Sequence, residues 1–193
     1  MSTTRPSSGD VTQVLRDLQR GDPVPDDAFA QVYDVLHRAA RQQRARWNGN
    51  ETLNTTALVH EAYVKLIGKD YADREHFLAV ASKAMRHLLV NYAERQAAQK
   101  RGGGQAPVPL DEVLIASPER AADVLALEEA LVRLEAFDPR AASVVECRFF
   151  GGLDAAETAE ALGVSRRTVT RDWGVARAWL FAELSRDFLD GTI

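Results

Sequence analysis

Apolar residues recur between Phe77 and Tyr92 with a period that suits one kind of backbone. They occupy positions i, i+3, i+4, i+7, i+8, i+11, i+12 and i+15 of this stretch, which places all of them on one face of an α-helix. A half-buried strand would need alternation at every second residue, and no stretch of the chain sustains it. Because no stretch alternates in this way, we expect an all-α protein.

Further segments show the same helical periodicity, with turn residues between them. Thr55 or Thr56 can cap the start of one helix, and Gly68 can end it. Gly151 and Gly152 close another helix in the C-terminal half. The expected helices span residues 27–47, 55–66, 125–134, 141–150, 154–162 and 165–184.

The helical pattern is interrupted once, and this interruption predicts two small domains. It stops at the glycines 102–104, and the proline-containing stretch that follows is acidic and has no period. We therefore expect a disordered N-terminus over residues 1–9, a helical domain over 10–101, an acidic flexible linker over 102–123 and a second helical domain over 124–193.

The composition is that of an ordinary globular protein. The chain has 193 residues, of which 46% are hydrophobic and 27% charged. No window approaches the ~18 consecutive apolar residues of a membrane span, and the N-terminal residues are polar, so we expect a cytoplasmic protein without a membrane partner. The single cysteine, Cys147, excludes an internal disulfide and a thiolate metal cage. We expect no metal and no cofactor.

Residues 153–171 have the pattern of a helix-turn-helix. Ala159 is small where two helices cross closely, Gly163 permits a left-handed turn, and Ser165 can cap the second helix. A helical hairpin that only looks similar is the alternative. The second helix would present polar residues to a DNA major groove, and the residues expected to contact DNA are Ser165, Arg166, Arg167, Thr168, Thr170, Arg171 and Arg177.

Taken over the whole chain, the formal net charge of −4 argues against a nucleic-acid partner. The distribution of charge along the chain leads to a different conclusion. Residues 165–177 hold four arginines and one aspartate, a local charge of +3. Residues 74–101 hold six basic and two acidic residues, a local charge of +4. Each run alone could be a solvated helix face. Together with the helix-turn-helix pattern, they indicate two contacts with nucleic acid.

Three ordered motifs resemble the extracytoplasmic-function (ECF) group of RNA polymerase sigma factors, across residues 10–185. The stretch 56–66 looks like that family's polymerase-clamp-binding helix. Residues 76–95, followed by the Lys-Arg-Gly-Gly string at 100–103, look like its promoter-melting helix. The C-terminal motif, continued through 172–180, is similar to its second DNA-binding domain.

The resemblance implies a promoter-specificity factor that bridges core RNA polymerase and promoter DNA, with no covalent chemistry of its own. The first domain would correspond to sigma region 2 and the second to sigma region 4, whose arginines would read the −35 element. The clamp contact would involve Leu58, Val59, Glu61, Ala62, Lys65 and Leu66. The −10 element would meet Arg86, His87, Asn91, Tyr92, Arg95, Lys100 and Arg101.

One departure from the family pattern suggests a mode of control. Many members carry acidic residues just before the clamp-binding helix, whereas residues 51–56 here read Glu-Thr-Leu-Asn-Thr-Thr. Phosphorylation of Thr55 or Thr56 by a Ser/Thr kinase would supply negative charge at a helix N-terminus and promote polymerase binding. The simpler interpretation is a threonine N-cap. An anti-sigma factor is the other partner that could hold such a protein inactive.

Two alternative functions make different predictions. A zinc-protease interpretation of His60-Glu61 fails because the second histidine would have to stand at position 64, which is Val64. No Gly-rich phosphate loop follows a strand, so we expect no enzymatic activity. A helix-turn-helix regulator that binds operator DNA without engaging polymerase is the nearer alternative, and a pull-down with core polymerase would distinguish it.

Overall fold

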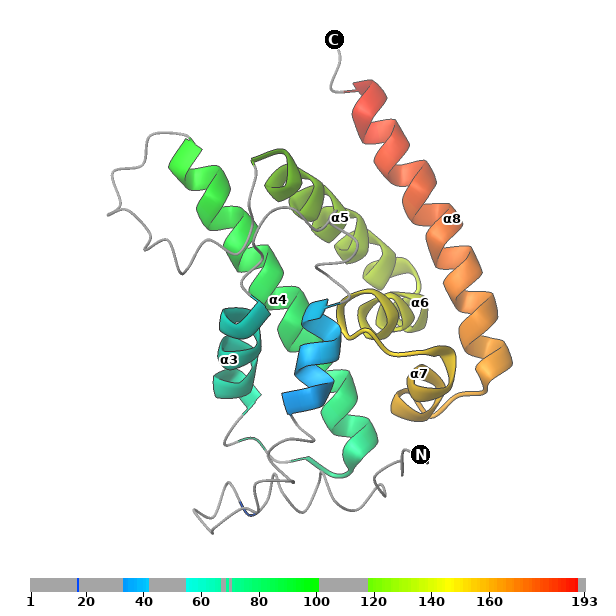
Figure 1. Cartoon of the computed structure of the whole chain (residues 1–193). Helices are drawn as coiled ribbons and strands as arrows, with labels where there is room; N and C mark the ends of the chain where they lie inside the picture. Colours follow the sequence, from blue (N-terminus) through cyan, green and yellow to red (C-terminus); the bar gives the residue numbers. More distant parts are fainter. Residues whose placement is uncertain are drawn as a thin grey trace.

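The computed structural model describes Asp17 and residues 33–41, 55–66, 69, 71–100 and 118–190, and the architecture below refers to these residues. Residues 33–41 are helical. The later elements are α3 (Thr55–Leu66), α4 (Arg74–Lys100), α5 (Pro118–Phe137), α6 (Pro139–Val145), a π-helical turn η2 (Glu146–Phe150), α7 (Ala155–Ala161) and α8 (Arg166–Asp190) (Figure 1). No strand occurs in this part of the chain, and the all-α prediction is confirmed.

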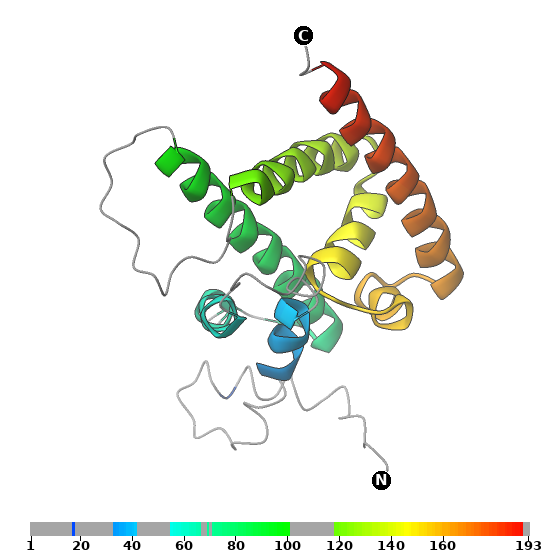
Figure 2. The ribbon, with the colours of Figure 1, turned by 45° about the horizontal axis from the view of Figure 1, so that its top comes forward.

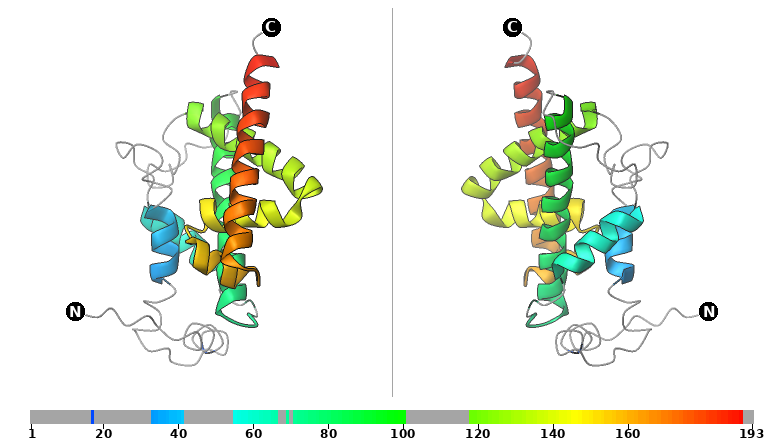
Figure 3. Two further views of the ribbon diagram at one scale, coloured as in Figure 1. Left: turned by 90° about the vertical axis from the view of Figure 1, so that its right-hand side faces the viewer. Right: turned by 90° about the vertical axis from the view of Figure 1, so that its left-hand side faces the viewer.

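The long helix α4 occupies the middle of the arrangement (Figures 1 and 2). Helix α3 packs against it, and α5, η2 and α7 contact it as well. Helices α5 and α6 lie between α4 and α8, and α8 packs on α5, α6 and α7 (Figures 1 and 3). Because α4 comes from the first expected domain and α5 to α8 from the second, the two halves are packed together in this structure.

The apolar stripe that predicted α4 is the centre of the core. All its members are buried except Val80, which is half-buried and packs against the same cluster. The cluster continues without interruption into both halves, through Leu58 of α3, Leu131 of α5 and Phe150 of η2. One core therefore serves the segments on both sides of the expected linker.

Helix boundaries differ from the predicted ones mainly at α5. Residues 118–123, assigned from the sequence to the acidic linker, are the first turns of α5. Pro118 suits the first helical position, since its missing N–H is not needed there. Linker residues 102–117, the N-terminal residues 1–16 and the outer parts of the helix expected at 27–47 lie outside the described residues.

Helix α4 begins earlier and ends later than its apolar stripe. Asp73 precedes its first residue, and the Asp73 carboxylate accepts a hydrogen bond of 2.7 Å from the backbone N–H of His76. This contact satisfies one of the amides that a helix start leaves without an intrahelical partner. The helix then runs to Lys100, so Arg95 and Lys100, which follow the stripe, lie on the same helix.

Candidate nucleic-acid interface

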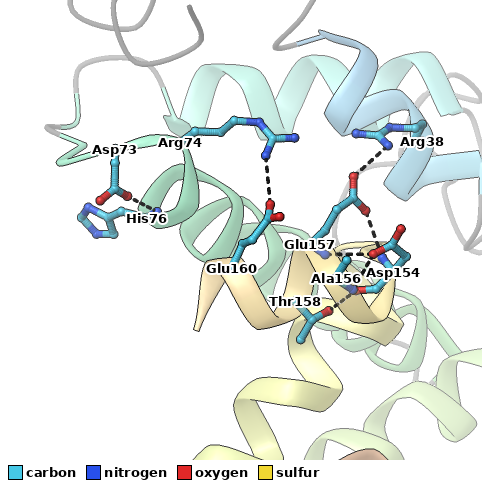
Figure 4. Close-up of polar contacts among 9 residues, drawn as sticks. All are labelled: Arg38, Asp73, Arg74, His76, Asp154, Ala156, Glu157, Thr158 and Glu160. Atoms are coloured by element: carbon cyan, nitrogen blue, oxygen red, sulfur yellow. Dashed lines mark hydrogen bonds and ion pairs between the residues drawn. The ribbon is translucent and has the colours of Figure 1, made fainter. Parts of the chain in front are cut away.

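Helix α7 is the first helix of the predicted helix-turn-helix, and its start is fixed by a capping box. The Asp154 carboxylate accepts from the backbone N–H groups of Ala156 at 2.7 Å and Glu157 at 2.8 Å. In return, Glu157 accepts from the Asp154 N–H at 3.0 Å. These reciprocal bonds, drawn in Figure 4, give this short helix a defined first turn.

The turn between α7 and α8 uses the residues that the sequence predicted. Gly163 has a positive φ of 63°, a backbone region that suits glycine. Ala159 is buried where the helices cross, in a small cluster with Val169 and Val144. The predicted roles of Ala159 and Gly163 are confirmed.

Ser165 forms the cap that its sequence position suggested. Its hydroxyl accepts a hydrogen bond of 3.1 Å from the backbone N–H of Thr168, and α8 begins at the next residue, Arg166. A helix N-terminus capped in this way still presents its first amides to the solvent, where a phosphate could meet them.

The first turns of α8 carry an exposed polar face. Arg166, Arg167, Thr170 and Arg171 are exposed, Thr168 is half-buried, and Arg177 is exposed further along the helix. An open hollow on this face is lined by four of the predicted DNA-contacting residues: Arg167, Thr168, Thr170 and Arg171. The structure therefore places these side chains together on one solvent-facing surface.

Behind this surface, Asp172 is a buried acid with two arginine partners. Its side chain is 5% exposed, and it accepts hydrogen bonds from Nε of Arg140 at 2.7 Å and Nε of Arg171 at 2.9 Å. Burial alone would raise the pKa of Asp172, but the hydrogen bonds and charges of the two arginines outweigh it and hold the pKa below its ordinary value. The acid is therefore charged at neutral pH.

Trp173 links α8 to η2 through cation–π contacts. The guanidinium of Arg148 lies 4.8 Å from the centre of the indole ring, and that of Arg177 lies 5.9 Å from it. Such contacts favour a fixed position of the cation over the ring face. Arg177, one of the residues predicted to meet DNA, is thus oriented by a neighbouring aromatic side chain.

Helix α4 presents only part of its predicted −10 surface. His87, Asn91 and Arg95 are exposed and lie one turn apart, in line with exposed Lys83. Tyr92 is buried and donates a short hydrogen bond to Glu61 of α3. The side chain of Lys100 and all of Arg101 lie outside the described residues.

Arg86 does not lie on the exposed face of α4 that its charge suggested. Its side chain is 3% exposed and forms a fork with Glu128 of α5, with Nε···Oε2 at 2.7 Å and Nη2···Oε1 at 2.9 Å. Nη1 donates to Glu146 of η2 at 2.5 Å and lies 3.6 Å from Glu135. In this structure Arg86 therefore contacts the second half of the chain, where DNA cannot reach it.

The residues expected to bind polymerase divide into a buried and an accessible group. Four of them pack in the core between α3 and its neighbours: Leu58, Val59, Ala62 and Leu66. Lys65 is exposed and Glu61 is half-buried. The buried members cannot touch a partner in this structure, because the helical period that made them look like an interface is the one that directs them to the core. Thr56, His60 and Val64 form the accessible face of α3, with Val64 57% exposed.

Helix α3 begins at Thr55, so Thr55 and Thr56 lie in its first turn and not at the cap position that the sequence suggested for one of them; Thr56 is exposed. Its first turn contains no acidic residue. The positive end of the helix dipole therefore has no carboxylate from that turn near it.

Sequence reasoning missed the acidic partners that hold the two halves together. Besides the carboxylates around Arg86, Glu157 pairs with Arg38 at 3.2 Å and Glu160 with Arg74 at 3.8 Å, both across the interface (Figure 4). Acidic residues on helices normally face solvent, and nothing in their spacing identifies a partner distant in sequence. Only the tertiary packing shows these pairs.

Comparisons with known proteins identify the family of this chain. Within the described residues, no group of three or more His, Cys, Asp or Glu is placed to hold a metal ion, and none of the described helices could span a membrane. Searches of curated proteins and of solved structures gave no match. The family model described as ECF sigma factor matches residues 8–186. The chain therefore belongs to the ECF sigma factor family, whose members act with core RNA polymerase in promoter-directed transcription.

Proposed function

We propose that this sigma factor reads the −35 element with the exposed face of α8. The observation that carries the proposal is the row of exposed arginines on a capped helix whose partner helix, α7, packs behind it. Arg166 and Arg167 lie in the first turn, where a recognition helix meets base edges. An arginine there can form paired hydrogen bonds to the O6 and N7 atoms of guanine.

The −10 element would be met by α4 in the first domain. Its exposed row of His87, Asn91 and Arg95 offers hydrogen-bond donors and a cation, which suit an unpaired base and the backbone beside it. The guanidinium of Arg95 lies 5.5 Å from the ring centre of Tyr92. Tyr92 thus supports the row from the core side.

Docking on the polymerase clamp would use the accessible face of α3. Thr56, His60, Val64 and Lys65 are exposed, and Val64, which is 57% exposed, offers an apolar contact among polar side chains. The four buried members of the predicted set would then act indirectly, by holding α3 against the core.

Run-off transcription with purified core polymerase tests this assignment. Promoters selected by the wild-type holoenzyme define the −35 and −10 sequences. Arg166→Ala or Arg167→Ala should cost about 1–3 kcal/mol of promoter binding and relax the preference at one −35 position. Arg41→Ala removes an exposed arginine elsewhere and is the matched control. Uniform loss on all sequences would identify a phosphate contact, and failure to bind core polymerase would indicate an operator-binding regulator.

Phosphorylation of Thr55 or Thr56 would activate polymerase binding. The lack of an acidic residue in the first turn of α3 supports the idea, because a phosphate there would interact favourably with the helix dipole. The controlling agent would be a Ser/Thr kinase, with an anti-sigma factor as the alternative.

Substitutions at both threonines separate phosphorylation from a structural role. Serine keeps a hydroxyl that a kinase can modify, whereas asparagine keeps a polar side chain that such a kinase does not modify. Transcription in cells should survive Thr→Ser at both positions and fall with Thr→Asn. Equal activity of the two double variants, at equal protein level, would leave only a structural role for these residues.

A further inference from the structure

Asp172 combines burial with contact to an exposed arginine of the recognition face. Both carboxylate oxygens of Asp172 have an arginine partner. Oδ2 accepts a hydrogen bond from Nε of Arg140 on α6. Oδ1 lies 2.9 Å from Nε and 2.9 Å from Nη2 of Arg171. The Arg171 side chain is nevertheless 63% exposed. Its guanidinium is therefore held at one edge while the rest faces the solvent.

A carboxylate beneath a DNA-binding surface repels phosphates, so its presence there calls for a compensating role. A guanidinium has five N–H donors in a fixed planar fork. With Nε and one N–H of Nη2 directed at Asp172, the end formed by the two Nη atoms is left free. That end has the geometry for two parallel bonds to a guanine edge.

We propose that Asp172 is a positioning residue for promoter recognition: it fixes the fork of Arg171 so that its free end reads a base, and Arg140 anchors the acid to α6. The proposal rests on the assignment of α8 to the −35 element. Without Asp172, Arg171 swings freely and neutralises a phosphate instead. Selectivity then falls while affinity for any DNA rises.

Selection of −35 sequences by holoenzyme carrying Asp172→Asn tests this role. Discrimination at one position should fall about tenfold, which is within the range for one bidentate contact. The plot of log affinity against log salt should become steeper by about one, because a freed arginine neutralises one more phosphate. A merely structural role predicts weaker binding to every sequence and an unchanged slope.

Two further variants isolate the Arg171 contact. Arg171→Ala should relax the same position, and Asp172→Asn should add no further loss of discrimination in that background. Arg140→Ala removes the anchor of Asp172 and should relax the same position less than Asp172→Asn does, because the contact of Asp172 with Arg171 remains. The proposal is overturned if Asp172→Asn keeps full discrimination. If Arg166→Ala and Arg167→Ala also change nothing at the −35 element, the assignment of α8 itself fails.

Discussion

Replacing Gly151 with alanine tests the packing of the two halves at its tightest point. The added Cβ would lie 1.9 Å from the Ser82 hydroxyl oxygen and 2.8 Å from both the Ser82 Cβ and the Cys147 carbonyl oxygen. Gly151 has φ −78° and ψ −17°, which alanine adopts readily, so any cost comes from the contact and not from the backbone. Contacts this short force α4 and η2 apart.

The expected loss of unfolding free energy follows from two opposed terms. Overpacking a close-packed site costs about 1–3 kcal/mol. Replacing glycine with alanine also lowers the conformational entropy of the unfolded chain, which stabilises the folded state by about 0.4–1 kcal/mol. We therefore expect Gly151→Ala to lower the stability by about 1–2 kcal/mol, or roughly 2–8 °C in Tm for a chain of this size.

Urea unfolding of single and double variants measures this effect. Ser82→Ala removes the nearest atom, at the loss of its hydrogen bond to the Leu78 carbonyl. If the halves meet here, Ser82→Ala should recover about 1 kcal/mol in the Gly151→Ala background. Gly152→Ala is the control, because Gly152 has φ 67° and its cost arises in the backbone, independent of Ser82. Equal costs of Gly151→Ala with serine or alanine at position 82 would refute this account of the interface.

Four other outcomes follow from the structure. The pKa of Asp172 is held below its ordinary value of 3.8. The stability that this acid contributes is therefore complete above pH 3.8 and is lost as the pH falls below it. In an acid titration of unfolding free energy, Asp172→Asn should lack this pH-dependent loss. Burial, with a smaller contribution from the nearby Glu146, raises the pKa of the Cys147 thiol to about 12, although its hydrogen bond with Ser82 acts in the opposite direction. A thiol reagent at pH 8 should therefore label the folded chain far more slowly than the unfolded chain. Leu58→Ala should cost about 2–5 kcal/mol in urea unfolding, since Leu58 is fully buried. Val64→Ala should change stability by less than about 0.5 kcal/mol and still weaken core polymerase binding in a sedimentation assay.

The helices could be predicted because each depends on local spacing. The stripe from Phe77 to Tyr92, the cap at Ser165 and the left-handed Gly163 all follow from interactions within a few residues. The start of α5 was placed too late, because Pro118 was assigned to the linker when it also suits a first helical turn. The exposed polar face of α8 could be predicted for the same local reason, since its arginines belong to one short motif.

Other site residues could not be placed from spacing. Arg86 looked like a surface residue because it is charged and stands outside the apolar stripe of α4, yet its guanidinium is buried by carboxylates from α5 and η2. Leu58 and Val59 looked like a docking surface because a core face and an interface face have the same apolar period. In both cases, the residues that cover the side chain are distant in sequence, so local spacing does not distinguish a buried position from an exposed one.

The sequence alone determined that this protein is helical, that it carries a helix-turn-helix and that its basic residues gather in two regions. These features depend on periodicity, capping and local charge, which the order of residues specifies directly. Tertiary structure decided which charges face the solvent and which hold the two halves together. The physical reason is that burying a cation requires carboxylates positioned by other helices, and only the folded arrangement brings Glu128 and Glu146 to Arg86.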